Sequence, residues 1–204
     1  MKINTNTWNK CRYTLYSPFY NLISRVFLQS RQKAIGLLAV KPGEKVLLIG
    51  AGTGLDLDFL PPTALITATD ITPAMVARLI RRGARLQLPV NAQVMDGQCL
   101  TLPDNAFDKI VLHLILAVIP DPVRCLQEAE RVLKPGGQIV VFDKFLQPGH
   151  QVGFFRRVAN FLTNFLFSNI TRRFENIVAQ TNLKVSLDQP ANFGGNFRII
   201  LLQK

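Results

Sequence analysis

The chain has 204 residues, enough for one well-filled hydrophobic core and few for two domains. A hydrophobic fraction of 48% excludes a disordered chain, and 24 Lys and Arg against 13 Asp and Glu give a net charge of +11, which favours an acidic partner or an anionic surface. The 3 cysteines are scattered and lack metal-ligand spacing, so the sequence predicts a reducing compartment, no disulfide framework and no metal site.

The positive charge is concentrated at the two ends of the chain. Residues 1–45 contain 8 basic residues against 1 acidic, residues 46–150 contain 9 against 10, and residues 151–204 contain 7 against 2. The first residues lack the apolar region of a signal peptide, and no apolar run is long enough to span a bilayer. We therefore expect a cytoplasmic protein whose two basic ends share one face.

Residues 1–40 are predicted to form a basic, amphipathic helical segment. Ser17-Pro18 is typical of a helix start, and apolar residues recur after it at helical spacing. The apolar positions are Phe19, Leu22, Ile23, Val26 and Phe27, and the basic positions are Arg25, Arg31 and Lys33. Such a helix is suited to lying on an anionic membrane surface.

Residues 41–145 alternate short apolar runs with helical patterns, which predicts a parallel α/β sheet. The expected strands are 46–50, 64–70, 92–95, 109–116 and 138–143, and the expected helices are 74–86 and 123–133. Thr72-Pro73 is typical of a helix start, and Pro135-Gly136-Gly137 is expected to end the second helix before the fifth strand.

The most informative motif, Gly50-Ala51-Gly52-Thr53-Gly54, follows the first expected strand. Glycines let the backbone approach a ligand and turn sharply into a helix, which here is expected to start near Leu55. Leu55 stands where a dinucleotide fingerprint needs a small residue, and a P-loop would need Lys and Ser or Thr after the last glycine. NAD and a nucleoside triphosphate are therefore both disfavoured.

Two aspartates follow neighbouring expected strands. Asp70 ends the second strand, sixteen residues after Gly54, where a carboxylate can accept both hydroxyls of a ribose. Asp96 follows the third strand, so both carboxylates should reach the crevice at the carboxyl ends of the sheet. The pair indicates a ligand that contains a nucleoside; the alternative is that the two acids only cap a helix and a turn.

Residues 146–204 begin with a segment rich in Phe and Arg and end in two strand-like runs. Residues 153–180 contain six Phe among four arginines, Arg156, Arg157, Arg172 and Arg173. This segment is expected either to dock on anionic lipid or to cover a core with its arginines in solvent. The runs 184–187 and 197–202 are expected to pair antiparallel, with Gly194-Gly195 in the turn.

Four segments in order resemble the motifs of class I S-adenosylmethionine-dependent methyltransferases: LLIGAGTG, ATDITPAM, MDGQCLTLPDNAFDKIV and RVLKPGGQIVVFD. The resemblance covers residues 10–204 and implies one domain, 1–204, with a Rossmann-like three-layer sandwich. Its seven-stranded sheet would be mostly parallel with an antiparallel last strand. The implied cofactor is S-adenosylmethionine, bound by Gly50, Ala51, Gly52, Thr53, Gly54, Asp70, Ile71, Met75, Asp96 and Gly97.

The resemblance also assigns a role to each part of this set. The glycine loop would hold the methionine end of the cofactor and Asp70 the ribose, while Asp96 with Gly97 would flank the adenine. Ile71 and Met75 would pack against the purine. One departure stands out, because the family usually has Glu or Asp two residues before the first glycine, where this chain has Leu48.

Three further residues are candidates for the cofactor or the chemistry. Tyr13 and Tyr20, in YTLYSPFYN, resemble the tyrosines of the YDxxAxxYD segment of quinone and phospholipid methyltransferases, which implies that both face the cofactor. Packing at an interface is the alternative for both. His113, at the carboxyl end of the fourth strand, would by resemblance line the acceptor pocket beside the cofactor, unless it is only a satisfied buried histidine. Tyr20 and His113 are the catalytic candidates for accepting a proton.

Two longer stretches, LHLILAVIPDPVRCLQEAERVLKPGGQIVVFDKF and FGGNFRIILLQK, are similar to bacterial phospholipid N-methyltransferases, which methylate phosphatidylethanolamine. This similarity implies an enzyme of the EC 2.1.1 type that acts on a lipid acceptor, peripheral on the inner face of a membrane. It also accounts for the basic ends, because each basic residue near an anionic surface contributes about 1 kcal/mol to binding.

Two alternatives stay open at this point. One is a methyltransferase for a soluble small molecule or a quinone-like hydrophobic acceptor, and the other is a non-catalytic, membrane-binding relative, which Leu48 would suit. A nucleic-acid acceptor is disfavoured because residues 113–116 stand where methyltransferases of base amines carry an Asn/Asp-Pro-Pro-aromatic motif. We expect a monomer.

Overall fold

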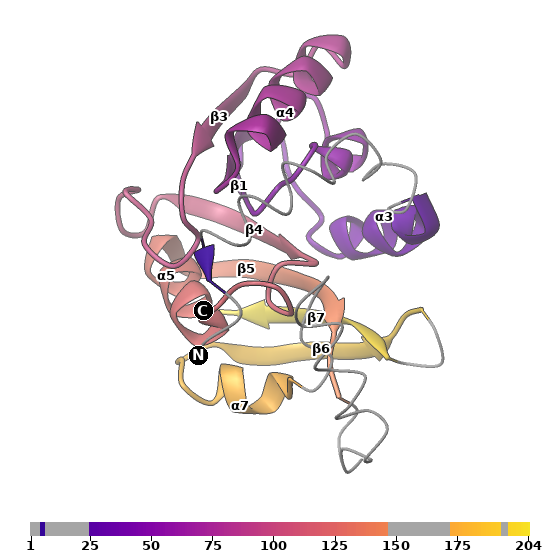
Figure 1. Ribbon diagram of the computed structural model, residues 1–204. Coiled ribbons are helices and arrows are strands. Elements are labelled where there is room, and N and C mark those ends of the chain that lie inside the picture. The colour runs from indigo at the N-terminus through magenta and orange to yellow at the C-terminus, as the bar shows by residue number, and fades with distance from the viewer. Residues whose placement is uncertain (1–4, 7–24, 147–171, 193–195) are drawn as a thin grey trace.

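The computed structural model describes residues 5–6, 25–146, 172–192 and 196–204. The features predicted at Tyr13, Tyr20, Arg156, Arg157 and Gly194-Gly195 lie outside these residues. The described chain forms a seven-stranded sheet of order β3-β2-β1-β4-β5-β7-β6 (Figure 1). The predicted α/β class and the number of strands are thereby confirmed.

The strands are β1 (Lys45–Ile49), β2 (Leu65–Asp70), β3 (Val90–Val94), β4 (Phe107–His113), β5 (Leu133–Lys144), β6 (Lys184–Pro190) and β7 (Phe197–Gln203). β1 to β5 pair in parallel, whereas β7 pairs antiparallel with both β5 and β6, which confirms the reversed last strand. The strand order changes direction between β1 and β4, and ligands of open α/β sheets bind outside the carboxyl ends of strands at such a point.

Helices cover both faces of the sheet, which confirms the three-layer sandwich (Figure 1). α5 and α7 pack on one face, and α3, η2 and α4 pack on the other. Their bounds are η1 (Arg25–Phe27), α3 (Leu28–Leu37), η2 (Leu55–Phe59), α4 (Pro73–Arg85), α5 (Pro122–Val132) and α7 (Phe174–Val178). Among the described residues, no helix is long and apolar enough to cross a membrane.

Each face of the sheet buries its own hydrophobic cluster, because successive residues of a strand point to opposite faces. Leu47 and Ile49 of β1 belong to the cluster that includes α5. Val46 and Leu48 belong to the cluster that includes α3. Burial on both faces explains why the central strands are continuous apolar runs in the sequence rather than alternating ones.

The ends of two strands differ from the prediction. β4 ends at His113 rather than at residue 116, because Leu114 has a φ of 59° and leaves the extended conformation. α5 ends at Val132, and β5 begins directly after it. Residues 134–137 form an irregularity in the pairing of β5 with β4, where Gly136 has a φ of 75°. The Pro-Gly-Gly sequence therefore makes a bulge inside a strand and does not end the helix.

The helix expected to start near Leu55 is only the five-residue 3-10 helix η2. It ends at Phe59, after which Leu60 is extended and two prolines follow. A proline lacks the backbone N–H that a continuing helix needs, which limits the helix to one short piece. The glycine loop is therefore followed by a tight turn and not by a long helix.

The described part of the N-terminal helical segment presents fewer basic side chains to solvent than predicted. Arg31 is only 3% exposed, whereas Val26, expected on the apolar face, is 60% exposed. Phe27 does point inward, with its ring centroid 5.8 Å from that of Phe142 and 4.8 Å from that of Phe197. The prediction that Arg31 is a surface cation is wrong, because its charge is paired with an acid from another element.

Candidate active site

The glycine loop between β1 and η2 lies at the carboxyl end of the sheet. Gly50, Gly52 and Gly54 have φ values of 68°, 56° and 80°, in the left-handed region that favours glycine. A Cβ atom on Gly50 would lie 2.3 Å from Cδ1 of Ile115, so this part of the loop packs directly against the segment after β4. Glycine at position 50 therefore allows the loop and this segment to pack closely.

Asp70, the last residue of β2, fixes this loop. Its carboxylate accepts a hydrogen bond from the backbone N–H of Gly52 at 2.9 Å and another from that of Thr72 at 2.8 Å. Burial raises the pKa of the Asp70 carboxyl above its ordinary value, and the two backbone donors offset part of this effect. Each carboxylate oxygen has a further lone pair, so Asp70 can still accept bonds from two hydroxyl groups.

Asp96, which follows β3, is held by a network of side chains. Its Oδ2 accepts a hydrogen bond from Nδ2 of Asn6 at 2.5 Å, and its Oδ1 accepts one from the backbone N–H of Gln98 at 2.9 Å. Oε1 of Gln98 in turn accepts one from the backbone N–H of Asp121, the N-cap of α5. The network brings residue 6 beside residue 96, a contact that no sequence pattern indicated.

A cleft of mixed polarity lies between these residues. Its lining includes seven of the residues predicted to bind the cofactor: Gly50, Gly52, Asp70, Ile71, Met75, Asp96 and Gly97. Ala51, Thr53 and Gly54 are buried within the loop and do not line the cleft. The side chain of His113 is not part of the lining either, although the next residue, Leu114, is.

The segment after β4 supplies a wall of the cleft that the sequence analysis did not identify. Its apolar residues Leu114, Ile115, Val118, Ile119 and Pro120 line the cleft together with Asn6, Thr72 and Met95. A signal for this wall was present in the sequence, because residues that directly follow a parallel strand lie at the carboxyl edge of the sheet. The cleft therefore has a polar end at the two aspartates and an apolar side after β4.

His113 ends β4 in a buried ionic cluster. Its Nδ1 lies 2.7 Å from Oδ1 of Asp56, and Nη1 of Arg31 lies 2.7 Å from Oδ2 of the same carboxylate. Burial alone would raise the pKa of Asp56, but the charges and hydrogen bonds of Arg31 and His113 outweigh it and hold that pKa below its ordinary value. The sequence analysis missed Asp56 and Arg31 as partners of His113, because the three residues come from three separate elements.

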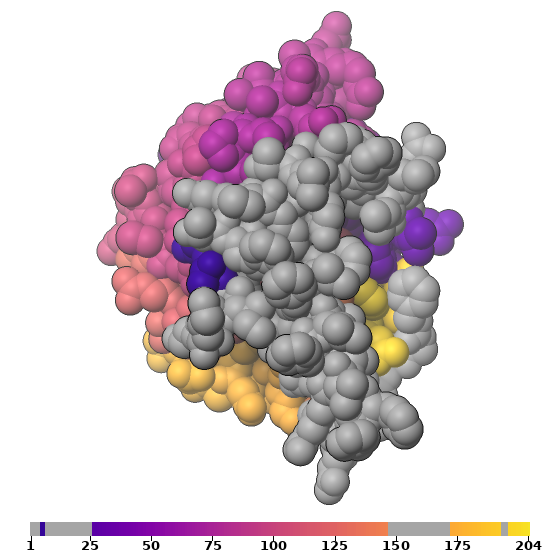
Figure 2. Space-filling model, in the orientation of Figure 1, coloured from indigo at the N-terminus to yellow at the C-terminus, as the bar shows by residue number. Residues whose placement is uncertain are grey.

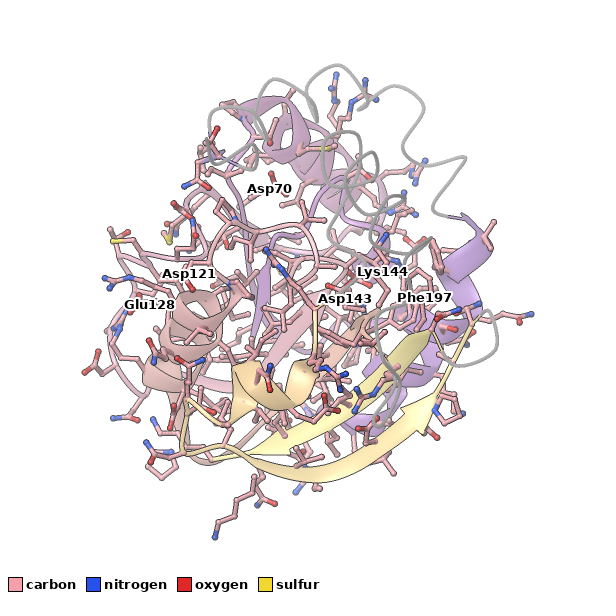
Figure 3. All side chains as sticks on the ribbon, turned by 60° about the horizontal axis from the view of Figure 1, so that its bottom comes forward. Asp70, Asp121, Glu128, Asp143, Lys144 and Phe197 are labelled. Atoms are coloured by element: carbon pink, nitrogen blue, oxygen red, sulfur yellow. The ribbon has the colours of Figure 1, made fainter. Side chains whose placement is uncertain are left out.

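Asp143, near the end of β5, is another buried carboxylate, on the face of the sheet opposite to His113. It accepts hydrogen bonds from the backbone N–H groups of Ala117 at 2.9 Å and Lys144 at 2.8 Å. Burial raises the pKa of Asp143 to about 6, against the opposing effects of these donors and of the Lys144 and Arg172 charges. Figure 3 shows Asp143 and Lys144 beside Phe197, where β5 pairs with β7.

Arg172 has a structural role in the described chain. Its guanidinium donates hydrogen bonds to the backbone carbonyl oxygens of Leu116 and Pro120. It thereby ties the segment before α7 to the wall of the cleft. The structure does not support the prediction that Arg172 is a surface cation that binds lipid, because its guanidinium is hydrogen-bonded to this loop.

The residues of the cleft fit the cofactor that the resemblance implies. Gly50 and Gly52 line the cleft without side chains, so a ligand can approach the loop backbone closely, and Asp70 has lone pairs available for ribose hydroxyls. Ile71 and Met75 provide apolar surface for a purine. Leu48 is 1% exposed in the core beneath α3, so no acid serves the loop from that position.

Comparison with known proteins connects this geometry to a family. A sequence model described as a methyltransferase domain matches residues 47–141. A phosphatidylethanolamine N-methyltransferase of Cereibacter sphaeroides is 29% identical over 164 residues, which are 79% of this chain and 81% of that protein. A demethylmenaquinone methyltransferase of Thermus thermophilus is 30% identical over 166 residues, 75% of this chain and 76% of that protein.

Among solved structures, the [4+2]-cyclase SpnF is similar with a TM-score of 0.82 at 16% identity, covering 98% of this chain and 96% of its own. This likeness shows the fold alone, because one fold can host different chemistries. The sequence matches support a family assignment, because the matched domain includes the glycine loop and the strand ends that form the cleft. The chain belongs to the S-adenosylmethionine-dependent methyltransferases, with S-adenosylmethionine as its cofactor.

Proposed function

We propose that the protein transfers methyl groups from S-adenosylmethionine to the nitrogen of phosphatidylethanolamine at a membrane surface. The observation that carries this proposal is the match to the Cereibacter sphaeroides phosphatidylethanolamine N-methyltransferase, over 81% of that enzyme. The matched length of 164 residues extends well beyond the domain segment 47–141. The similarity therefore includes parts of the chain outside the cofactor-binding strands.

Helix α4, whose first turn lines the cleft at Met75, supports the membrane part of the proposal with a basic outer surface. It carries no acid and four arginines: Arg78, Arg81, Arg82 and Arg85. Arg81 and Arg85 are exposed, and Ile80 beside them is 52% exposed. In the described part of the chain, only Arg82 of the four forms an ion pair, with Asp58. Figure 2 shows α4 at the upper margin of one face of the molecule, where it can meet a surface.

The apolar wall after β4 suits a hydrophobic acceptor. S-adenosylmethionine supplies an activated sulfonium methyl group, so the protein mainly has to align the acceptor nitrogen and exclude water. Leu114, Ile115 and Val118 exclude water from one side of the cleft. An ammonium group must lose a proton before its lone pair can attack, and His113 is our candidate for receiving that proton. Tyr20, the other candidate, lies outside the described residues.

A second candidate function is methylation of a quinone-like acceptor. The observation that favours it is the similarity to demethylmenaquinone methyltransferases, among them one of Tropheryma whipplei (strain Twist) that is 37% identical over 136 residues. That match covers 56% of the relative, a smaller share than the phosphatidylethanolamine enzyme gives. Both acceptors are hydrophobic, so the apolar wall does not separate them.

The experiment that separates these functions uses S-adenosylmethionine with a deuterated methyl group and the full chain. Anionic vesicles would contain phosphatidylethanolamine in one set and demethylmenaquinol in another, with products followed by mass spectrometry. We expect deuterated methyl groups on the phosphatidylethanolamine headgroup and none in control vesicles of phosphatidylcholine, whose nitrogen has no proton to lose. Label in the quinol alone would establish the second function, and no label despite cofactor binding would favour a non-catalytic relative.

A further inference from the structure

The buried cluster of Arg31, Asp56 and His113 lies directly behind the cleft. Arg31 comes from α3, Asp56 from η2 and His113 from the end of β4. The three residues are 3%, 2% and 4% exposed. Two 2.7 Å contacts join them through the Asp56 carboxylate, whose two oxygens each take one partner. A buried charge of this kind needs a function or a strong compensating interaction, because desolvation disfavours it.

The hydrogen-bonding capacity of these groups fixes the tautomer of the histidine. An ionised carboxylate can only accept hydrogen bonds, and the Arg31 guanidinium beside it keeps Asp56 ionised. Nδ1 of His113 must therefore donate in its 2.7 Å contact with Oδ1 of Asp56. In a neutral imidazole, a proton on Nδ1 leaves a lone pair on Nε2.

That lone pair has no partner in the described part of the chain. Nε2 of His113 is buried, and none of the described residues forms a hydrogen bond with it. Leaving a buried acceptor unsatisfied costs about 1–3 kcal/mol, so such atoms are uncommon without a function. The next residue, Leu114, lines the cleft, so the backbone of His113 adjoins it, while the ring itself is buried beside the lining.

We propose that Asp56, itself held by Arg31, is a positioning residue that fixes His113 with its Nε2 lone pair free to take a proton from the acceptor. This inference rests on the proposed function and deepens it. In the step, an N–H bond of the acceptor ammonium breaks, its electron pair stays on the nitrogen, and the proton bonds to Nε2. The imidazolium that forms keeps its Nδ1–H bond to Asp56, so the carboxylate stabilises the charge that the ring acquires.

The charged groups around the ring predict how it responds to substitution. Asp56 contributes a negative charge from η2, and Arg31 a positive charge from α3. On β5, the Phe142 ring packs edge-on against the His113 ring, with the two centroids 5.7 Å apart. Lys144 lies on the same face of β5 by strand alternation and is partly buried. Asp143 and Arg198 form a cross-strand pair on the opposite face. Asp56 therefore favours the charged ring, whereas Arg31 opposes it.

The first test measures the tautomer directly. The chain has 2 histidines, so a His150→Gln variant with 15N-labelled histidine gives ring signals from His113 alone. NMR of this otherwise complete chain should show a neutral ring with the proton on Nδ1 and an unprotonated Nε2. A neutral ring with the proton on Nε2 would overturn the inference, whatever the acceptor proves to be.

The second test uses two variants with different expected effects on the tautomer. Asp56→Asn removes the carboxylate that requires Nδ1 to donate, so the neutral ring should no longer carry its proton on Nδ1 alone in the same NMR spectra. Arg31→Met keeps this carboxylate, so the tautomer with the proton on Nδ1 should persist. A tautomer that is unchanged in Asp56→Asn would contradict the inference. If either variant fails to fold, the tautomer of the parent protein decides the question.

These readouts separate this inference from the proposed function. Absence of methyl transfer to phosphatidylethanolamine would overturn the proposed acceptor while leaving the tautomer measurable. Transfer to phosphatidylethanolamine by a protein whose His113 carries its proton on Nε2 would leave the proposed function in place and remove the role of Asp56.

Discussion

Two buried aspartates at the carboxyl edge of the sheet show opposite electrostatic arrangements. Asp70 accepts hydrogen bonds from the backbone N–H groups of Gly52 and Thr72, and burial raises its pKa. Asp56 is paired with Arg31 and His113, and its pKa is lowered. Asp70 lines the cleft, whereas Asp56 does not.

The difference indicates which of the two carboxylates is available to bind a ligand and which is paired within the protein. The charge of Asp56 is balanced within the fold by a cation and a ring N–H. The charge of Asp70 has no side-chain cation in its described contacts and keeps lone pairs that face the cleft, where ligand hydroxyls can satisfy them. We infer that Asp70 acts on the cofactor directly and that Asp56 acts through His113.

The largest expected effect is the loss of cofactor affinity when Asp70 is replaced. Asp70→Ala removes two charged hydrogen bonds that hold the glycine loop, each contributing about 1.5–3 kcal/mol, and also the acceptor for the ribose. We expect affinity for S-adenosylmethionine to fall by at least about 100-fold in calorimetric titration. Asp104→Ala, which removes a carboxylate that is 66% exposed, is the matched control and should bind normally. Unchanged affinity in Asp70→Ala would show that this carboxylate, like Asp56, is an internal structural charge.

A third buried aspartate, Asp143, has a raised pKa and should make the stability of the protein depend on pH. Burial raises its pKa to about 6 in the folded protein from an ordinary value of 3.8, so the folded state binds more protons between these values and loses stability as pH rises through them. Asp143→Asn removes this loss. The stability of the variant relative to the parent should therefore rise by about 2 kcal/mol between pH 4 and pH 7.

Denaturant titrations at several pH values measure this difference. Lys144 and Arg172, whose charges act on Asp143, are present in both proteins, so their contributions largely cancel. A stability difference that stays constant from pH 4 to pH 7 would show that Asp143 is ionised in the folded protein throughout.

The smallest expected effect concerns the basic outer surface of α4. Replacing Arg81 and Arg85 of α4 with Gln removes two exposed charges, each contributing about 1 kcal/mol at an anionic membrane. Partitioning into phosphatidylglycerol vesicles at low salt should fall by about 30-fold, and the difference should shrink as salt is added. The control, Lys33→Gln with Lys184→Gln, removes the same charge from α3 and from the opposite edge of the sheet. Equal losses in both variants would indicate an effect of net charge and not of α4.

The cofactor side of the cleft could largely be predicted from the sequence, because its residues lie in short motifs at strand ends. Gly50, Gly52, Asp70 and Asp96 each follow or end an apolar run, and the carboxyl-edge rule brings them together. The buried cluster could not be predicted in this way. Arg31 has the helical spacing of a surface cation, and only the packing of α3 against η2 shows that it pairs with Asp56.

The bulge in β5 shows a similar limit. Pro-Gly-Gly after an amphipathic helix is a common stop signal, yet the helix had already ended at Val132 and these residues lie within the strand. Pairing with β4 determines this outcome, and pairing is a property of two distant segments. Local patterns predicted the order of the elements, whereas contacts between elements set their ends.

Hydrogen–deuterium exchange of the full chain with and without S-adenosylmethionine tests most directly whether the cofactor binds in this cleft. With the cofactor bound, we expect slower exchange in peptides that cover residues 50–54, 70–75 and 95–98. We expect no comparable change in β6 (Lys184–Pro190), at the far edge of the sheet. Protection confined to other segments, or none at saturating cofactor, would contradict the assignment of this cleft as the cofactor site.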